Sequence, residues 1–386
     1  MNILYTHRTQ GRGVERVHIT GIVNALKDMG HHVDILSVPG AEIDEKEEQT
    51  DIIRKRSTLG AISKSFPQFL FEFFELLYNV IQLFRLPLQL RKKKYDFIYE
   101  RYSLFTFATV LICKIIGKPV ILEINDSVIV PRVRPCFFLK TARFLEKFIF
   151  KHAHSLVIIS TNFKNLIEEA YGPINSYVIS PNAVELRQFM PTNASRELRE
   201  SLNISEQSAV CGYIGAFHKW HGIEWFIKDY IARFKQNTDL GITLVMVGDG
   251  PLYSEMKALI EDEGLSEKII LTGRVQHKYI SDYISLFDFC IMPDSNSYGS
   301  PMKIFEYMAM SKGVLAPSYG PIAETVKDKQ TGWLTEVNNH NDFISRLFDI
   351  ASDKNALKDI GLNARQYIVN ERQWKHNAEQ FLELLP

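Results

Sequence analysis

Short runs of apolar residues, each closed by a glycine, a proline or a polar turn, recur along the whole chain. Such runs are typical of buried strands in parallel sheets, because both faces of these strands are covered. In the first half the predicted strands are residues 2–5, 32–38, 95–99, 119–124, 156–160 and 177–180. In the second half they are residues 210–214, 242–247, 269–271 and 288–292. The grouping predicts two sheets.

Between these runs, apolar residues recur every three or four positions, which predicts amphipathic helices. One such helix ends near Gly30, another covers residues 104–116 before Gly117, and a third covers residues 252–263. A strand, a glycine-rich turn, a helix and a second strand open the chain, as in a Rossmann-like half. The pattern therefore predicts an α/β protein with two Rossmann-like domains facing a cleft, with ligands at the carboxyl ends of the strands.

Residues 66–94 are almost wholly apolar except for one narrow polar stripe with helical spacing. The stripe consists of Glu72, Glu75, Asn79, Gln82, Arg85 and Gln89. The uncharged run between Glu75 and Arg85 is far shorter than the ~20 apolar residues that a spanning helix needs. This segment is therefore either a core helix or a helix lying in a membrane interface, and the basic residues 91–94 favour a membrane surface.

A second segment, residues 136–154, combines a basic stripe with aromatic neighbours. The stripe consists of Lys140, Arg143, Lys147 and Lys151, spaced three or four residues apart. A solvated helix face explains such charges, but the stripe contains no acid, and Phe137, Phe144 and Phe148 lie beside it. The sequence thus predicts an anionic membrane surface as one partner.

Composition narrows the possible partners and the compartment. The 386 residues suffice for two or three domains, and the 45 basic residues equal the 45 acidic ones, so nucleic acid is not an expected partner. The four cysteines, far apart, show no metal-ligand spacing. Because the chain begins directly with a predicted strand, without an apolar signal stretch, we expect a cytoplasmic protein, peripheral on the inner face of the plasma membrane.

The most informative stretch follows the strand at residues 288–292. Gly299 is expected to adopt a positive φ, Ser300 to cap a helix, and Pro301 to occupy its first position. The helix start and Lys303 then form an anion site, while Glu306 lies on the same face and suits sugar hydroxyls. Together they indicate a sugar phosphate, although the two charged residues also suit an ordinary solvated pair.

Polar residues also follow two strands of the first half, at the edge of the sheet where ligands bind. Glu100 and Arg101 follow residues 95–99, and Asn125 and Asp126 follow residues 119–124. We expect Glu100 and Arg101 on the acceptor side of a cleft. The alternatives are a local ion pair for Glu100 and Arg101 and a helix cap for Asp126.

The segment SPMKIFEYMAMSKGVLAP resembles the signature of the retaining glycosyltransferases of family 4, which have the GT-B fold. The resemblance implies that Glu306 binds the ribose of a nucleotide sugar. It also implies a diphosphate site formed by Tyr298, Gly299, Ser300, Pro301, Met302 and Lys303. Tyr298 stands where the family has a first glutamate, and that glutamate normally contacts the donor sugar.

The resemblance extends to other donor-binding loops. It implies that Gly11, Arg12 and Gly13 lie near the donor phosphates, and that His218 and Lys219 bind the diphosphate. His221 occupies the place of a lysine usual in the family. The loop with Arg274 and Val275 is expected at the nucleobase. In similar enzymes the loop with Asn125 and Asp126 lies near the acceptor and the reacting sugar.

The resemblance also sets the expected domains and reaction. The domains are residues 1–182 for the acceptor, 183–365 for the nucleotide sugar, and 366–386 as a C-terminal helix that returns to the first domain. The expected reaction is retaining transfer from a UDP-linked sugar to a lipid-linked sugar or a growing surface polysaccharide, without a metal or other cofactor. The expected catalytic residues are Asn125, Asp126, Lys219 and Glu306. A sugar-nucleotide epimerase and a non-catalytic sugar-nucleotide binder remain alternatives.

Overall fold

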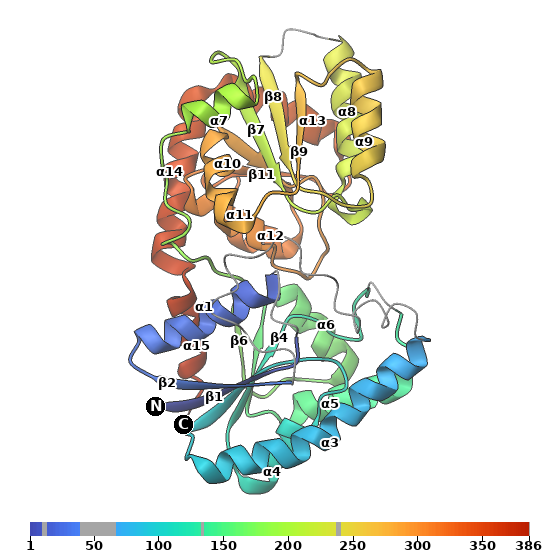
Figure 1. The fold of residues 1–386 in the computed structure, drawn as a ribbon, viewed down its shortest axis with the longest axis vertical. Coiled ribbons are helices and arrows are strands. Elements are labelled where there is room, and N and C mark those ends of the chain that lie inside the picture. Colours follow the sequence, from blue (N-terminus) through green and yellow to red (C-terminus); the bar gives the residue numbers. More distant parts are fainter. Residues whose placement is uncertain (10–13, 39–66, 133–134, 237–240, 386) are drawn as a thin grey trace. The chain divides into compact units, whose positions relative to one another are not determined.

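The computed structural model describes residues 1–9, 14–38, 67–132, 135–236 and 241–385. The chain forms two compact units, Met1–Pro181 with Trp374–Pro386 and Asn182–Gln373. Each unit contains a six-stranded parallel sheet with helices on its faces (Figure 1). The predicted α/β class with two Rossmann-like domains is confirmed, including a C-terminal helix that belongs to the first unit.

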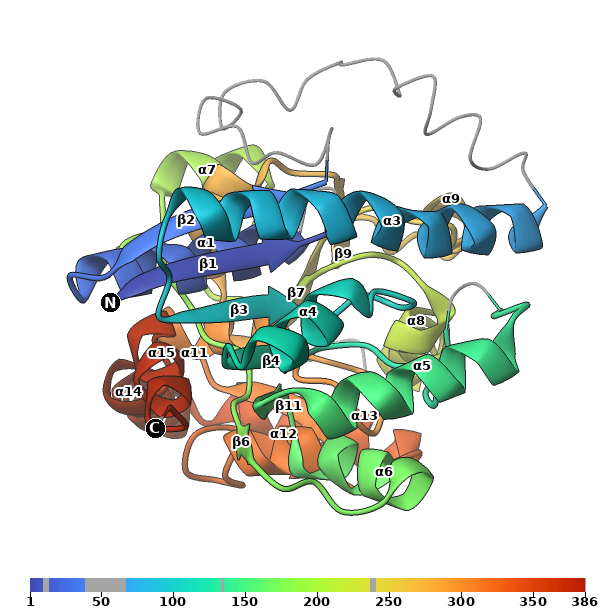
Figure 2. The same ribbon diagram turned by 90° about the horizontal axis from the view of Figure 1, so that it is seen from below.

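The first sheet has the strand order β2-β1-β3-β4-β5-β6. Its strands are β1 (Asn2–His7), β2 (His32–Ser37), β3 (Phe97–Arg101), β4 (Val120–Ile124), β5 (Ser155–Ile158) and β6 (Tyr177–Ile179). Its helices are α1 (Val14–Asp28), α3 (Gln68–Lys92), α4 (Ala108–Ile116), α5 (Leu139–His152), α6 (Thr161–Tyr171) and α15 (Trp374–Leu382). Helices α3, α4 and α5 lie side by side over one face of this sheet, while α1 packs against α15 (Figure 2).

A close contact between α1 and α15 fixes the C-terminal helix to the first unit. The ring of Trp374 lies 4.7 Å from the ring of His18, centroid to centroid. A Cβ atom on Gly21 would lie 2.4 Å from the Trp374 ring, so only glycine fits there. The close approach of the indole to the α1 backbone thus depends on a residue without a side chain.

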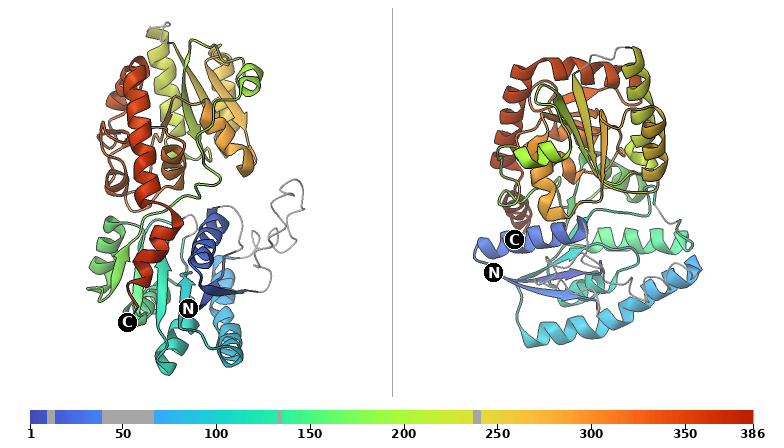
Figure 3. Two further views of the ribbon diagram at one scale, coloured as in Figure 1. Left: turned by 90° about the vertical axis from the view of Figure 1, so that its left-hand side faces the viewer. Right: turned by 45° about the horizontal axis from the view of Figure 1, so that its top comes forward.

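The second sheet has the order β12-β11-β10-β7-β8-β9. Its strands are β7 (Ala209–Ile214), β8 (Ile242–Val247), β9 (Ile269–Gly273), β10 (Phe289–Ile291), β11 (Val314–Pro317) and β12 (Trp333–Thr335). Its helices are α7 (Arg196–Ser201), α8 (Ile223–Gln236), α9 (Tyr253–Asp262), α10 (Ile280–Leu286), α11 (Met302–Ala309), α12 (Gly320–Thr325), α13 (His340–Ser352) and α14 (Lys354–Glu371). Figure 3 shows α8 and α9 on one side of the sheet and α14 on the other.

Both faces of the second sheet are buried, as the continuous apolar runs predict. Along β7, Cys211 and Tyr213 belong to one apolar cluster, which includes residues of α8, α9 and α13. Val210 and Ile214 belong to the other, which includes residues of α10, α11 and α14. Successive strand residues point to opposite faces, so one strand supplies both clusters.

Helix α3 has the opposite orientation from an ordinary amphipathic helix, because its polar stripe faces the protein. Glu72 accepts hydrogen bonds from the backbone N–H groups of Phe137 and Phe138, both at 2.7 Å. Further along the stripe, Arg85 donates to the carbonyl of Ser37, and Gln89 donates to the hydroxyl of Tyr95. Among the described residues, no helix is long and apolar enough to cross a bilayer.

Asn79 is the best-satisfied member of this stripe, with its side chain almost fully buried. Its Oδ1 accepts hydrogen bonds from the N–H groups of Phe107 and Ala108, at 2.9 and 3.0 Å. Its Nδ2 donates to the carbonyls of Phe105 and Leu76. Asn79 thus supplies the first turn of α4 with the acceptor that a helix start needs.

We expect Asn79→Leu to lower the free energy of unfolding by roughly 2–4 kcal/mol, because it leaves buried backbone groups without partners. The matched variant Leu77→Asn places the same amide on the exposed side of α3, and we expect a change within about 0.5 kcal/mol. Urea denaturation of both variants measures the two values. Equal losses of unfolding free energy in the two variants would contradict the burial of the polar side of α3.

Candidate functional site

In the second unit, a half-buried lysine lies at the carboxyl end of the central strand. Lys303, in the first turn of α11, has its Nζ 3.2 Å from the hydroxyl of Tyr213 and 4.4 Å from the centroid of that ring. Burial lowers the pKa of Lys303 to about 8, although the charge of Glu306 acts in the opposite direction. The ammonium therefore has a neutral phenol as its hydrogen-bond partner, and a bound anion would stabilise it.

Two glycines allow the loops after β7 and β8 to approach this lysine. A Cβ atom on Gly215 would lie 2.5 Å from Lys303 Nζ. A Cβ atom on Gly248 would lie 1.9 Å from the carbonyl oxygen of Gly215. The two loops are also joined by a hydrogen bond from Phe217 N–H to the carbonyl of Asp249, at 3.0 Å. On the side of the β7 and β8 loops, the Lys303 ammonium therefore lies against the backbone of Gly215, with no side chain between them.

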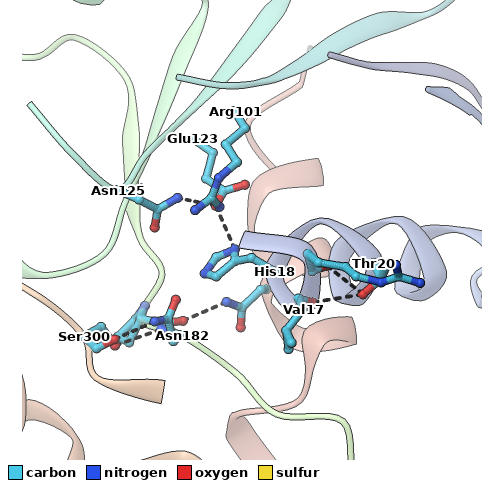
Figure 4. Close-up of polar contacts among 11 residues, drawn as sticks. Val17, His18, Thr20, Arg101, Glu123, Asn125, Asn182 and Ser300 are labelled. Atoms are coloured by element: carbon cyan, nitrogen blue, oxygen red, sulfur yellow. Dashed lines mark hydrogen bonds and ion pairs between the residues drawn. The ribbon is translucent and has the colours of Figure 1, made fainter. Parts of the chain in front are cut away.

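The start of α11 differs from the prediction by one residue, and its serine has another role. The helix begins at Met302, and Pro301 is its N-cap. Ser300 Oγ accepts a hydrogen bond from the backbone N–H of Asn182 at 2.9 Å, and Asn182 Nδ2 donates to the carbonyl of Ser300 (Figure 4). The predicted serine cap is wrong because this hydroxyl satisfies a buried N–H from a distant segment.

Gly299 serves a close contact rather than a positive φ. It is not among the residues with positive φ. Asn296 Oδ1 accepts the N–H groups of both Tyr298 and Gly299, and a Cβ atom on Gly299 would lie 2.7 Å from that oxygen. The expectation of a left-handed turn at Gly299 is therefore wrong, and the asparagine side chain folds the loop instead.

Glu306 lies one turn further along α11 and faces the loop after β9. Its residue is only 8% exposed, and its Oε1 lies 3.8 Å from Nε2 of His277. His277 also contacts Gln188, whose Nε2 lies 2.8 Å from its Nδ1. In the same loop, Arg274 is exposed and Val275 packs half-buried against the core. The structure thus brings Glu306 and this loop together, with His277 as a neighbour that the sequence did not indicate.

The loop after β7 places His221 near Lys303 and leaves Lys219 exposed. His221 Nδ1 lies 2.7 Å from the carbonyl of Ala216. Burial, followed by the charge of Lys303, lowers the pKa of His221 to about 4. His221 is therefore neutral at pH 7, with its proton on Nδ1. Lys219 begins the short turn Lys219–His221 with an exposed side chain, and His218 stacks on Trp220 at 4.0 Å.

In the first unit, a buried carboxylate gathers polar groups at the end of β4. Glu123 Oε1 lies 2.8 Å from Arg101 Nη1 and 2.9 Å from His18 Nδ1, and it accepts a hydrogen bond from Asn125 (Figure 4). Burial acts to raise the pKa of Glu123, but His18, Arg101 and Asn125 together lower it to about 2. No motif in the sequence indicates Glu123 or His18; the one available signal is an acid within the apolar run VILEI.

The structure places Glu100 and Arg101 differently from the prediction. Both are buried, and Arg101 pairs with Glu123 rather than with its neighbour. Burial raises the pKa of Glu100 to about 8, so its carboxyl is largely protonated at pH 7. Because successive residues of β3 point to opposite faces of the sheet, the two side chains cannot act together. Both side chains are buried, and the assignment of these two residues to the acceptor side stays a prediction.

The loop at Asn125 and Asp126 is held by α5. Asp126 is half-exposed; one carboxylate oxygen pairs with Arg132 and the other accepts the N–H of Ser127. Glu146, buried on α5, accepts the hydroxyl of Ser127 at 2.6 Å and the N–H of Val128 at 3.1 Å. This carboxylate links α5 directly to the candidate loop.

Two further parts of the predicted site need mention. Gly11, Arg12 and Gly13 lie outside the described residues. Within the part of the chain that the structure describes, no group of three His, Cys, Asp or Glu side chains is placed to hold a metal ion.

The lowered pKa of His221 predicts a pH dependence of stability. The unfolded chain takes up the proton near pH 6.5 and the folded unit only near pH 4, so stability falls as pH falls through this window. At pH 5 the loss is about 2 kcal/mol. We expect His221→Asn to reduce the loss in urea denaturation between pH 7 and pH 5. The control His340→Asn, at a half-exposed histidine, should retain it.

Two family models match the sequence on either side of the boundary between the units. The model described as Glycosyltransferase Family 4 matches residues 12–188. The model described as Glycosyl transferases group 1 matches residues 208–353. The second match contains Tyr213, Lys303 and Glu306. The first contains His18 and Glu123.

Proteins similar in sequence are also named as glycosyltransferases. An uncharacterized glycosyltransferase of Methanocaldococcus jannaschii is 25% identical over 248 residues, which are 64% of this chain and 61% of that protein. The UDP-Gal:alpha-D-GlcNAc-diphosphoundecaprenol alpha-1,3-galactosyltransferase of Escherichia coli is 24% identical over 295 residues, 76% of this chain and 74% of the relative. The chain thus spans about three fifths of the first relative and three quarters of the second.

Solved structures show the same fold. The structure of Anabaena HepE in complex with UDP superposes with a TM-score of 0.71 at 16% identity, covering 100% of this chain and 99% of that one. At 16% identity, this similarity shows that the two chains share a fold and shows nothing more.

Proposed function

Because the chain belongs to the group 1 glycosyltransferases of family 4, we propose that it transfers a sugar from a UDP-linked donor to a lipid-linked or polysaccharide acceptor, with retention of configuration. The family matches confirm the resemblance seen in the sequence. The donor, the acceptor and the stereochemistry are parts of the proposal.

The observation that carries this proposal is the half-buried Lys303 beside Gly215. Its ammonium lies at the strand ends of the second sheet with a phenol as its hydrogen-bond partner. A diphosphate would supply the missing negative charge, and the backbone N–H groups of the first turn of α11 would contribute to the same site. We assign Lys303 and the segment Tyr298–Met302 to the diphosphate, and Glu306 to the ribose hydroxyls.

The other residues of the predicted site are assigned to the base, the outer phosphate and the acceptor. Val275 offers backbone groups for the base, and Arg274 is an exposed neighbour. His218 and Lys219 are exposed or half-exposed, so we propose that they contact the outer phosphate only after the loop adjusts. Asn125 and Asp126 remain our candidates for the acceptor side.

Names of similar proteins support the choice of donor and acceptor. The Escherichia coli relative is named for UDP-galactose and for a diphosphoundecaprenol-linked sugar. The structure of Anabaena HepE was solved with UDP. We therefore propose a uridine nucleotide as the donor carrier and a lipid-linked sugar as the preferred acceptor class.

The proposed reaction proceeds on one face of the donor sugar. The bond between the anomeric carbon and the diphosphate oxygen breaks, the acceptor hydroxyl attacks the same face, and the leaving phosphate oxygen takes its proton. No nucleophile from the protein is needed. We propose that Lys303 and the α11 terminus, rather than a metal ion, stabilise the charge on the leaving diphosphate.

We also propose that the enzyme works at an anionic membrane surface. The stripe of Lys140, Arg143, Lys147 and Lys151 lies exposed on α5. Each basic residue close to such a surface contributes about 1 kcal/mol, so several together suffice for reversible attachment. The buried Glu146 of the same helix holds the loop at Asn125, so attachment would keep that loop near a lipid-linked acceptor.

A screen of nucleotide sugars, with free nucleoside diphosphate as the readout, tests the proposed activity. We expect release of UDP from one UDP-sugar, with or without EDTA, and faster release when a lipid-linked acceptor is added. An isomerised sugar without nucleotide release would identify an epimerase. Binding without any turnover would identify a non-catalytic binder, which the tyrosine at position 298 makes worth testing. Loss of activity in EDTA that Mg²⁺ restores would contradict the metal-free proposal.

We expect Lys303→Ala and Glu306→Gln each to weaken UDP binding about ten- to a hundred-fold, because each removes a charged hydrogen bond. Calorimetry with UDP measures the effect. Lys257→Ala and Glu261→Gln, at exposed positions in the same unit, are the matched controls and should bind UDP normally. Lys219→Ala should have the smaller effect of the two lysines; the reverse order would assign the diphosphate to Lys219.

A further inference from the structure

Helix α3 exposes an apolar surface between Phe69 and Leu88, while its polar side chains in that span are buried or half-buried. From Phe69 to Leu88, every side chain of this helix classed as exposed is apolar. These residues are Phe69, Phe73, Phe74, Leu77, Val80, Ile81, Leu83, Phe84 and Leu88. At 1.5 Å per residue, they form a stripe roughly 30 Å long. Contiguous apolar surfaces of this size mark a binding face.

The orientation of α3 is fixed by its polar contacts, so the apolar side cannot turn inward. Glu72 and Asn79 hold backbone groups of the neighbouring segments, as described above. Glu75 pairs with Arg8, and Gln82 accepts a hydrogen bond from Tyr78 and lies 3.4 Å from the hydroxyl of Thr109. Turning the helix would leave these buried groups without partners, at a cost of several kcal/mol.

The apolar surface continues from α3 onto the segment that leads into α5. The rings of Phe69 and Phe137 lie 5.8 Å apart, and Phe137 is 64% exposed. Phe144, on α5, is 72% exposed and lies next in sequence to Arg143. Helix α4, packed between α3 and α5, exposes Ile115 and Ile116. Figure 2 shows the three helices side by side, and each of them exposes apolar side chains.

The charges on these three helices have one sign. The charged side chains exposed on α3, α4 and α5 are all basic: Arg91, Lys92, Lys114, Lys140, Arg143, Lys147 and Lys151. The acids Glu72 and Glu146 are buried on the same helices. By contrast, α1 exposes both Glu15 and Lys27, and the whole chain has equal numbers of acidic and basic residues. An apolar stripe flanked by basic residues alone matches an anionic lipid bilayer, in which apolar side chains enter and cations meet headgroups.

We propose that the outward side of α3 inserts into one leaflet of an anionic membrane, with α3 lying parallel to the surface. The basic residues of α5 then contact headgroups beside it. This inference rests on the proposed membrane location. It adds insertion of the apolar side of α3 to the electrostatic attachment through the basic residues of α5. It requires neither the proposed donor nor transfer activity.

Flotation with vesicles of phosphatidylcholine and phosphatidylglycerol tests the insertion. The α3 variant is Phe73→Gln, Phe84→Gln and Leu88→Gln; the α5 variant is Lys140→Gln, Arg143→Gln and Lys147→Gln. The matched control, Met190→Gln, Leu362→Gln and Val369→Gln, changes three exposed apolar residues of the second unit. We expect the α3 variant to bind about a hundred-fold more weakly and the control to bind normally.

Salt separates the two contributions. The α5 variant should bind more weakly at low salt, whereas the wild type should keep part of its binding at high salt, because apolar insertion is not screened. An α3 variant that binds as the wild type does would overturn the proposal and leave only the electrostatic attachment. A wild type that ignores vesicles but forms a dimer, which the α3 variant abolishes, would identify a second copy as the occupant.

A depth measurement provides an independent readout. We expect fluorescence of a Phe84→Trp variant to be quenched by lipids brominated in their acyl chains, beyond the quenching seen with the wild type. Met190→Trp should show no added quenching. Absence of quenching at position 84 on bound protein would exclude insertion. Because these assays contain no donor, a failed insertion and a failed transferase assay are distinguishable.

Discussion

A buried polar group must find a hydrogen-bond partner, and this constraint organises the first unit. Glu72, Asn79 and Glu146 project from helices into the protein, and each accepts backbone N–H groups from a neighbouring segment. Asn79 completes the start of α4, Glu72 positions the segment before α5, and Glu146 holds the loop after β4. On α3 the polar side chains therefore point inward and apolar side chains remain outside, whereas α5 buries Glu146 but keeps its basic side chains exposed.

The same constraint has a different result in the second unit. Lys303 is half-buried at the strand ends, but its hydrogen-bond partner, Tyr213, is neutral. Burial consequently lowers the pKa of the ammonium, whereas the paired Glu123 of the first unit has a lowered pKa and a stable charge. A cation whose direct hydrogen-bond partner carries no charge suits a site that receives a diphosphate and must later release it. This contrast between the two units supports donor binding in the second.

The candidate site divides into residues that the sequence could indicate and residues that it could not. Lys303 and Glu306 lie within one continuous segment with a family signature, so local pattern sufficed. Tyr213 and Gly215 contact Lys303 from about ninety positions earlier in the chain, and no local pattern links them. His18 and Glu123 likewise meet across two elements. Ser300 was misjudged for the same reason, because its partner Asn182 is distant in sequence.

The sequence alone determined most of the strands, the two α/β units and the family, because apolar periodicity and a continuous motif are local properties. It also determined that one side of residues 68–92 is polar and the other apolar. Periodicity shows which residues share a side of a helix, but not which side faces the protein. Only the tertiary structure supplied the partners of Glu72, Asn79 and Arg85, and those hydrogen bonds decided that the polar side is buried.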